Sequence, residues 1–559
     1  MPTNLDADFD ANANANANAN ASADFNELQR DDYQAARQRV SSLREFLQAS
    51  EREPVRLIET HISWVLLAES VAYKLKKPLR LPFLDFSTLA LRRHFCAEEV
   101  RLNERLAPSA YLGVVEVRAG PAGAEFGGEG PVREVAVRMR RFPDGALWSE
   151  LLAAGRLTPL HIDAMAERLA QFHRDAAVAP PGSSFGSAAS HASVVQGLAR
   201  GIDGDPALSS APEWPALRNW LMAQPPQLAP LWAARLREGR VRECHGDLHL
   251  ANVLQLHGQP AAFDGIEFDP ALRWIDVLDD IAFLAMDLMA NGARALAFRF
   301  INAYLQSSGE HEGLPALRYY WVCRAVVRAR VVSMAAQQAI RPAAQASQAA
   351  AYMALASALS TGGDARLAIT HGLPGSGKSH AAQAVAEEAG AICVRSDVER
   401  KRFFGLGALE SSHGRIAGGI YGAATTLRTY ARLAELARVA LAAGWPVVVD
   451  AAFLQRTERA AFAALAAECA APFNIIDCRA EPAVLRQRLK QRQATGGDAS
   501  EADADVLERL TAADEPLSEA ERIGAFVIDA GDAGDAAPSA GLASRWRAAT
   551  VGEGALSVR

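Results

Sequence analysis

The chain has 559 residues, half of them hydrophobic and 22% charged, and its net charge is −7. At about 100 to 200 residues per domain, this length predicts two to four globular domains. The acidic balance excludes a bulk basic surface for nucleic acid or an anionic membrane, and no stretch reaches the ~18 apolar residues of a membrane span.

The cysteine pattern and the N-terminus indicate the compartment. The six cysteines are scattered, without the spacing of a metal site or a redox pair, and the N-terminus has no apolar segment of the secretory type. We therefore expect a cytoplasmic protein.

The sequence pattern of the N-terminal half predicts a disordered tail followed by a domain of two lobes. Residues 1–27 include the run ANANANANAN, whose low complexity favours disorder. Helical spacing follows from about 28 to 51, then strand patterns at 64–70 and 71–77, a helix around 95–107 and an alternating strand at 132–142. Residues 156–340 are mostly helical in pattern, with an interruption near 241–268. Residues 28–359 thus predict an α+β bilobal domain.

The segments HGDLHLANVL (245–254) and AAFDGIEFD (261–269) carry the spacing of a phosphate-transfer site. Asp247 precedes Asn252 by five residues, the offset between the base and the Mg²⁺-binding Asn of a kinase catalytic loop. Asp264 ends an apolar strand and is placed as the other Mg²⁺ ligand. An aspartate base and two oxygen ligands for the metal are most of what the chemistry needs.

The two histidines of this segment allow another hypothesis. His245 and His249 are spaced i and i+4 and could hold a transition metal together with Asp247. That arrangement needs a helix, which a position at a strand end does not favour. A capped turn with a structural histidine is the third reading.

Lysine is scarce in this chain, because only six of its 58 Lys and Arg residues are lysine. Val71 to Lys74 copy the V-A-I-K strand motif, whose Lys pairs with ATP phosphates and with a helix Glu. Lys76 lies on the same strand face, whereas Lys77 faces the other way. One of them could substitute for Lys74, or the three lysines could belong to a charged edge strand. Glu99, with Glu98 as the alternative, is the expected partner on the next helix.

These motifs resemble the aminoglycoside-phosphotransferase-like branch of the kinase fold, which includes choline kinase, over residues 50–340. Leu250 departs from the Pro that is common in this branch. The resemblance implies the following roles: Asp247 as catalytic base, Asn252 and Asp264 as Mg²⁺ ligands, Lys74 and Glu99 in ATP binding, residues 138–148 as an adenine-contacting hinge, and Asp280 as structural support of the catalytic loop.

The sequence pattern changes after residues 360–366, which form a Gly- and Ser-containing linker. Strands and helices alternate over residues 367–532, which predicts an α/β domain with a parallel sheet. Residues 533–559 are expected to form a C-terminal tail.

GLPGSGKS, from Gly372 to Ser379, fits the P-loop pattern at every fixed position and lies between a predicted strand and a predicted helix. Loop N–H groups and the helix N-terminus cradle phosphates, Lys378 reaches the β- and γ-phosphates, and the Ser379 hydroxyl holds Mg²⁺. The predicted nucleotide-binding residues of the loop are Gly372, Gly375, Ser376, Gly377, Lys378 and Ser379.

Charged residues after the next strands suggest the rest of this site. Asp397 lies at a strand's carboxyl end, where it could accept the proton of an acceptor hydroxyl, or could instead cap a helix. Asp450 ends a run of valines and could orient Mg²⁺ through water, or could instead cap a helix. Four arginines complete the predicted site: Arg395 or Arg400 for a substrate anion, and Arg488 and Arg492, on one helix face, for a lid or a solvated surface.

Together these residues resemble the small P-loop kinases of the adenylate-kinase, gluconate-kinase, polynucleotide-kinase and zeta-toxin type, over residues 366–530. Such domains are often labelled AAA-family ATPases, but the second arginine-finger region and the small helical domain of AAA motors are missing from the sequence. The resemblance implies Asp397 as base and Arg488 and Arg492 as lid residues.

The whole sequence resembles bacterial fusions of a phosphotransferase-like and a P-loop kinase-like domain. We expect an enzyme that uses ATP and Mg²⁺ to phosphorylate small-molecule hydroxyls, with no membrane partner and no strong nucleic-acid signal. One alternative is a catalytic P-loop domain regulated by a nucleotide-sensing first domain. Another is a plain ATPase that drives a conformational change.

Overall fold

A computed structural model of the chain describes residues 27–81, 84–121, 123–338, 342–412, 420–495, 499–529 and 541–549. The chain divides into two compact units, unit 1 (Met1–Ala290 and Ala316–Ser360) and unit 2 (Asn291–Pro315 and Thr361–Arg559). Apart from residue 27, the predicted N-terminal tail lies outside the described residues. In the described ranges, we find no helix with the length and apolarity that a bilayer crossing requires.

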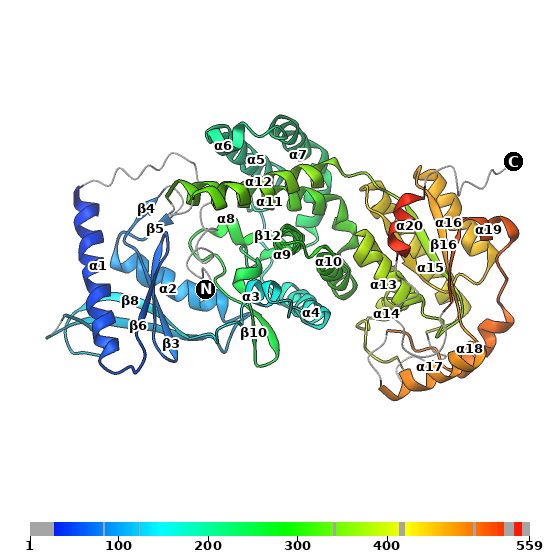
Figure 1. Cartoon of the computed structure of the whole chain (residues 1–559), viewed down its shortest axis with the longest axis horizontal. Helices are drawn as coiled ribbons and strands as arrows, with labels where there is room; N and C mark the ends of the chain where they lie inside the picture. The colour runs from blue at the N-terminus through cyan, green and yellow to red at the C-terminus, as the bar shows by residue number, and fades with distance from the viewer. Residues whose placement is uncertain are drawn as a thin grey trace. The chain divides into compact units, whose positions relative to one another are not determined.

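An antiparallel sheet with the strand order β1-β2-β3-β8-β6-β7 forms the first lobe of unit 1 (Figure 1). Helices α1 and α2 cover its opposite faces, since Trp64 and Leu66 pack with α1 while Val65 packs with α2. The elements are α1 (Glu27–Gln48), β1 (Arg56–Glu59), β2 (Ser63–Leu67), β3 (Val71–Lys76), β4 (Arg80–Leu81), β5 (Leu84–Asp85), α2 (Leu89–Asn103), β6 (Tyr111–Gly120), β7 (Gly123–Phe126) and β8 (Val132–Arg140).

The second lobe of unit 1 is helical, with short strands around the HGD motif. The motif lies between β9 and η1, and the β10–β11 hairpin follows it. The elements are α3 (Trp148–Ala153), α4 (Pro159–Asp175), α5 (Ala188–Asp203), α6 (Pro206–Ser209), α7 (Trp214–Arg237), β9 (Val241–Glu243), η1 (Leu250–Asn252), β10 (Val253–Leu256), β11 (Gln259–Ala262), α8 (Pro270–Arg273), β12 (Trp274–Asp276), α9 (Val277–Ala290), α11 (Leu314–Gln338) and α12 (Pro342–Thr361).

A parallel sheet with the order β14-β15-β13-β16-β17 forms the centre of unit 2. The P-loop follows the central strand, β13. The elements are α10 (Arg294–Ser308), η2 (Glu310–Gly313), β13 (Leu367–His371), α13 (Lys378–Ala389), β14 (Ile392–Arg395), α14 (Ser396–Arg402), α15 (Ala423–Ala442), β15 (Val447–Asp450), α16 (Arg456–Glu468), β16 (Phe473–Arg479), α17 (Pro482–Thr495), α18 (Ala504–Ala512), α19 (Glu519–Ile523), β17 (Ala525–Asp529) and α20 (Leu542–Ala548).

Among the described residues of unit 2, two α-helices lie outside the range predicted for the second domain. Helix α10 falls within 28–359, but Asn302 donates to Ala391 O at 2.9 Å and accepts from Cys393 N at 2.7 Å, which ties α10 to the start of β14. Helix α20 falls within the predicted tail, but its fully buried Trp546 packs in the core of unit 2 with α13 and the sheet. Long-range packing, rather than the local sequence pattern, therefore defines both ends of this unit.

Candidate active sites

The HGD loop of unit 1 buries the predicted base. Asp247 is 7% exposed, and Asn252 Nδ2 donates to its backbone oxygen and to its Oδ2, both at 3.0 Å. Burial alone would raise the pKa of Asp247, but the neighbouring His249 and His245 lower it below its usual value. The carboxylate is therefore ionised at neutral pH, as a residue that orients an acceptor hydroxyl must be.

Asp280 of α9 holds the backbone of this loop. It accepts from the N–H groups of Gly246 at 2.8 Å and His245 at 3.2 Å, and its Oδ2 lies 3.1 Å from His173 Nε2. Although burial opposes ionisation, these contacts hold the pKa of Asp280 at about 2. Gly246 adopts φ 84°, and a Cβ there would collide with Leu272 O.

Lys74 on β3 contacts both Glu99 on α2 and Asp264. Its Nζ lies 3.0 Å from Glu99 Oε1 and also forms an ion pair with Asp264 Oδ1. Burial would lower the pKa of Lys74, but the carboxylates of Asp264 and Glu99 outweigh burial and raise it well above the usual value. Glu98 contacts Arg101 instead of the lysine, so Glu99 is the helix carboxylate at this site.

The backbone of Asp264 is held in an unusual conformation, with φ 61°. Its N–H donates to the Tyr111 hydroxyl at 3.2 Å, and the next N–H, that of Gly265, donates to Asn103 Oδ1 at 2.7 Å. A left-handed conformation is costly for a residue with a Cβ. These two hydrogen bonds therefore fix where the Asp264 carboxylate points.

The histidines of the HGD loop interact mainly with the backbone. His245 Nε2 lies 2.9 Å from Phe263 O, and its Nδ1 accepts from Asp247 N at 3.3 Å. His249 Nδ1 accepts from Ala251 N at 3.2 Å. Both ring nitrogens of His245 are thus engaged with the backbone, which supports the structural reading of this residue.

The P-loop of unit 2 wraps around a partly buried lysine. Gly372 has φ 136°, and a Cβ there would collide with Cys478 O. Lys378 Nζ donates to Leu373 O at 2.8 Å. Burial lowers the pKa of Lys378, and Asp450 opposes this effect only in part.

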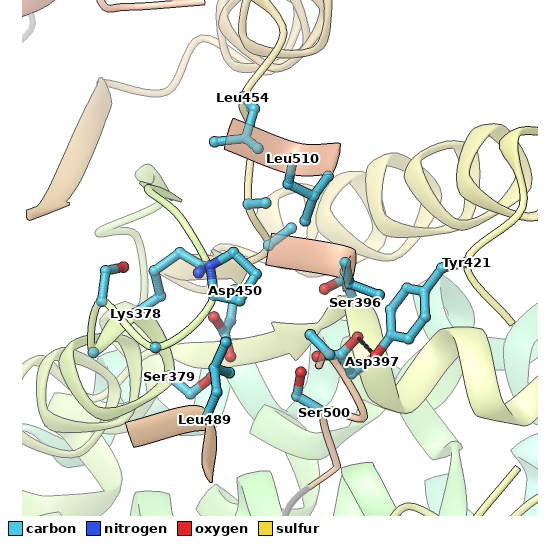
Figure 2. Close-up of a pocket in the computed structure, with 18 of the residues that line it drawn as sticks. Lys378, Ser379, Ser396, Asp397, Tyr421, Asp450, Leu454, Leu489, Ser500 and Leu510 are labelled. Atoms are coloured by element: carbon cyan, nitrogen blue, oxygen red, sulfur yellow. Dashed lines mark hydrogen bonds between the residues drawn. The ribbon is translucent and has the colours of Figure 1, made fainter. Parts of the chain in front are cut away.

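A cavity of about 1320 Å³ joins the P-loop to the predicted base of unit 2. Figure 2 shows Lys378, Ser379 and Asp450 on one side of the pocket and Asp397 with Tyr421 on the other. Asp450 is the last residue of β15, and Asp397 lies in the first turn of α14, two residues after β14 ends, so both lie at the carboxyl edge of the sheet, which carries the P-loop. The site predicted in separate segments is thus brought together around one cavity.

The arginines of unit 2 differ in their surroundings. Arg395 Nε donates to Asp450 Oδ2 at 3.2 Å, so it holds a side chain of the site. Arg400 lines the cavity, and its NH1 donates to Thr426 Oγ1 at 3.0 Å. On α17, Arg488 NH1 donates to Gly375 O at 3.2 Å, whereas Arg492 NH2 donates to Ala502 O at 2.8 Å.

Several residues that line or support these sites carry no motif. In unit 2, the Tyr421 hydroxyl donates to Asp397 Oδ1 at 3.4 Å and accepts from Glu501 N at 2.9 Å. In unit 1, Glu267 forms an ion pair with Lys76. Tyr421 follows a segment without strong periodicity, and Glu267 lies among apolar residues near Asp264, so only the three-dimensional structure identifies them.

A family model and several solved structures match parts of this chain. Residues 367–517 match the AAA domain family. Among solved structures, a gluconokinase from Sinorhizobium meliloti 1021 is 19% identical, with a TM-score of 0.23 over 33% of this chain and 89% of that one. A choline/ethanolamine kinase family protein from Mesorhizobium loti is 14% identical, with a TM-score of 0.33 over 58% of this chain and 94% of that one.

Two mycobacterial relatives extend over both units. The uncharacterized protein Rv2004c of Mycobacterium tuberculosis is 31% identical over 458 residues, which cover 81% of this chain and 89% of the relative. The uncharacterized protein Mb2027c of Mycobacterium bovis matches to the same extent. The chain therefore belongs to the same protein family as Rv2004c and Mb2027c.

Proposed function

We propose that both units bind ATP with Mg²⁺ and transfer the γ-phosphoryl group to hydroxyl groups of small molecules. The observation that carries this proposal is the cavity of unit 2, in which the P-loop Lys378 and the carboxylate of Asp397 line opposite sides of one space. Phosphoryl transfer needs mainly positioning and charge stabilisation, which these two groups supply.

In unit 2, Lys378 binds phosphate oxygens and Asp397 accepts the hydroxyl proton of the acceptor. Tyr421 orients Asp397 through its hydroxyl, and Arg395 orients Asp450. The Ser379 hydroxyl and Asp450 are the oxygen ligands that would hold Mg²⁺, and the bound ion neutralises charge on the phosphates.

In unit 1, Asp247 is the corresponding base and Lys74 the phosphate-binding cation. Asn252 uses its Nδ2 atom for both hydrogen bonds to Asp247, so its Oδ1 is the atom that fits a metal ligand. Asp264 supplies the second oxygen ligand. Before Lys74 can bind phosphates, its ion pair with Asp264 must be exchanged for one with the nucleotide.

That ion pair favours a second candidate function, in which unit 1 senses a nucleotide and only unit 2 transfers phosphate. Lys74 and Asp264 neutralise each other in a largely buried site, an arrangement that is complete without a nucleotide. In this case ATP would bind to unit 1 without turnover.

The experiment compares the full-length wild type with Asp247→Asn and Lys378→Ala. Each protein is incubated with ATP, Mg²⁺ and a library of hydroxylated metabolites, and phosphorylated products are detected by mass spectrometry. Loss of different products in the two variants is the expected result. If Asp247→Asn loses no product while unit 1 still binds ATP, unit 1 is a sensor. If no acceptor is phosphorylated although both units bind ATP, the proposed transfer is wrong.

A further inference from the structure

A chain of five buried or half-buried charges runs behind the predicted ATP site of unit 1. In order it consists of Asp264, Lys74, Glu99, Lys76 and Glu267, with positive and negative groups alternating. Glu99 uses its Oε1 for Lys74, at 3.0 Å, and its Oε2 for Lys76, at 2.7 Å. Each carboxylate oxygen of Glu99 thus faces a different lysine.

Strand geometry produces this arrangement. Lys74 and Lys76 are two residues apart on β3, so both point to the face covered by α2, which carries Glu99. Glu267 follows Asp264 by three residues on the segment after β11. The chain of charges therefore ties β3, α2 and the segment of Asp264 together, and these are the three parts whose alignment sets the ATP site.

Lys76 is too deeply buried to reach a nucleotide. Its side chain is 1% exposed, and its Nζ lies 4.9 Å from the centre of the Phe86 ring. Glu267 is 4% exposed, and its carboxylate pairs with Lys76. Without Glu267, the buried Lys76 would depend for charge compensation on Glu99, which it shares with Lys74.

We propose that Lys76 and Glu267 are positioning residues, which hold Glu99 so that Lys74 is presented to the ATP phosphates. This inference rests on the ATP binding proposed for unit 1. If Lys76 is removed, Glu99 Oε2 loses its donor, and the carboxylate can turn both oxygens toward Lys74 and draw it away from the nucleotide. Glu267 compensates the charge of Lys76, so both members of the pair are required.

The test measures MgATP binding by calorimetry in full-length protein that carries Lys378→Ala, so that only binding to unit 1 is measured. The paired change Lys76→Met with Glu267→Leu removes both charges together, which avoids an unpaired buried ion. We expect it to weaken ATP binding about tenfold while the unfolding temperature stays close to that of the reference. In the Lys74→Met background, the same paired change should cause no further loss of affinity.

Lys77→Met is the matched control, because Lys77 is a buried lysine next to β3 that contacts Glu59 and Thr60 on the other side. It should lower thermal stability and leave ATP affinity unchanged. Additive losses with Lys74→Met, or an unchanged affinity in the paired variant, would overturn the inference. If the Lys378→Ala reference binds no MgATP, ATP binding by unit 1 is itself wrong, and Lys76 has nothing to position. Because binding is measured, an unidentified acceptor does not affect the result.

Discussion

Lys74 and Lys378, the two lysines predicted to bind phosphate, lie in opposite electrostatic surroundings. Carboxylates raise the pKa of Lys74 well above its usual value, whereas burial lowers the pKa of Lys378. The first lysine is held charged by its neighbours before any ligand arrives. The second has only partial compensation from Asp450, and in the proposed function a bound phosphate would supply further negative charge.

This contrast predicts different pH profiles for the two sites. A lysine with a lowered pKa loses its proton at a pH below 10.5, the ordinary pKa of lysine, and the neutral amine then cannot form an ion pair with phosphates. ATP affinity of unit 2 should therefore fall as the pH is raised from about 7 toward 10. The ATP affinity of unit 1 should not fall in this range because of its lysine, since Lys74 stays protonated. Calorimetric titrations in Lys74→Met and in Lys378→Ala isolate the two sites. Equal slopes would contradict the prediction.

The HGD loop of unit 1 depends on helix α9 through Asp280. Asp280→Ala leaves two buried N–H groups, those of His245 and Gly246, without an acceptor. We expect a loss of about 3 kcal/mol in the free energy of unfolding, measured by urea denaturation. Asp144→Ala, at a side chain that is 80% exposed, is the control and should change it by less than about 0.5 kcal/mol.

The Asp280 carboxylate also makes the stability of the protein depend on pH in the acidic range. Because its pKa is about 2 in the folded protein, below the ordinary 3.8, its contribution to stability is complete above pH 3.8 and is lost as the pH falls toward 2. The Asp280→Ala variant lacks this contribution. The difference in unfolding free energy between the wild type and Asp280→Ala should therefore shrink as the pH falls from 3.8 toward 2. A constant difference would contradict the lowered pKa of Asp280.

Local patterns predict the elements that hold the motifs but not all of their partners. The P-loop is predictable because its glycines, lysine and flanking strand and helix are contiguous, and β3 is predictable from the V-A-I-K pattern. Glu98 and Glu99 could not be separated by spacing, because only the packing of α2 decides which one faces Lys74. Glu267 and Tyr421 were missed because their partners lie far away in sequence.

Helix α20 contributes to the core of unit 2, although its sequence pattern gives little indication of this role. Trp546 is fully buried among residues of α13 and the sheet of unit 2. Trp546→Ala should cost about 3 to 5 kcal/mol of unfolding free energy, because it leaves a large cavity. The exposed Ser544, on the same helix, provides the control Ser544→Ala, with an expected change below about 0.5 kcal/mol. Equal effects of the two changes would show that the helix does not pack as described.

At the scale of the whole molecule, the sequence predicts the order of the two folds but not the path of the chain between them. The structure confirms an α+β unit with a sheet lobe and a helical lobe, followed by an α/β unit with a parallel sheet. The chain enters unit 2 early, however, through residues 291–315, and returns to unit 1 before it builds the P-loop sheet. Helical periodicity alone cannot show this, because α10 looks like its neighbours in pattern and differs only in what it packs against.

The interleaved path predicts that α10 responds to ligands of unit 2. Ligand binding stabilises the whole cooperative unit that forms the site, and amide hydrogen exchange reports this stabilisation helix by helix. Asn302 joins α10 to β14, and Phe298 packs against Trp445, with ring centres 6.3 Å apart. ATP added to Lys74→Met protein should therefore slow exchange in residues 294–308. It should have no such effect when Lys378→Ala is also present. If exchange in α10 instead follows nucleotide binding at unit 1, tested in Lys378→Ala protein with Lys74 intact, then the helix belongs energetically to unit 1.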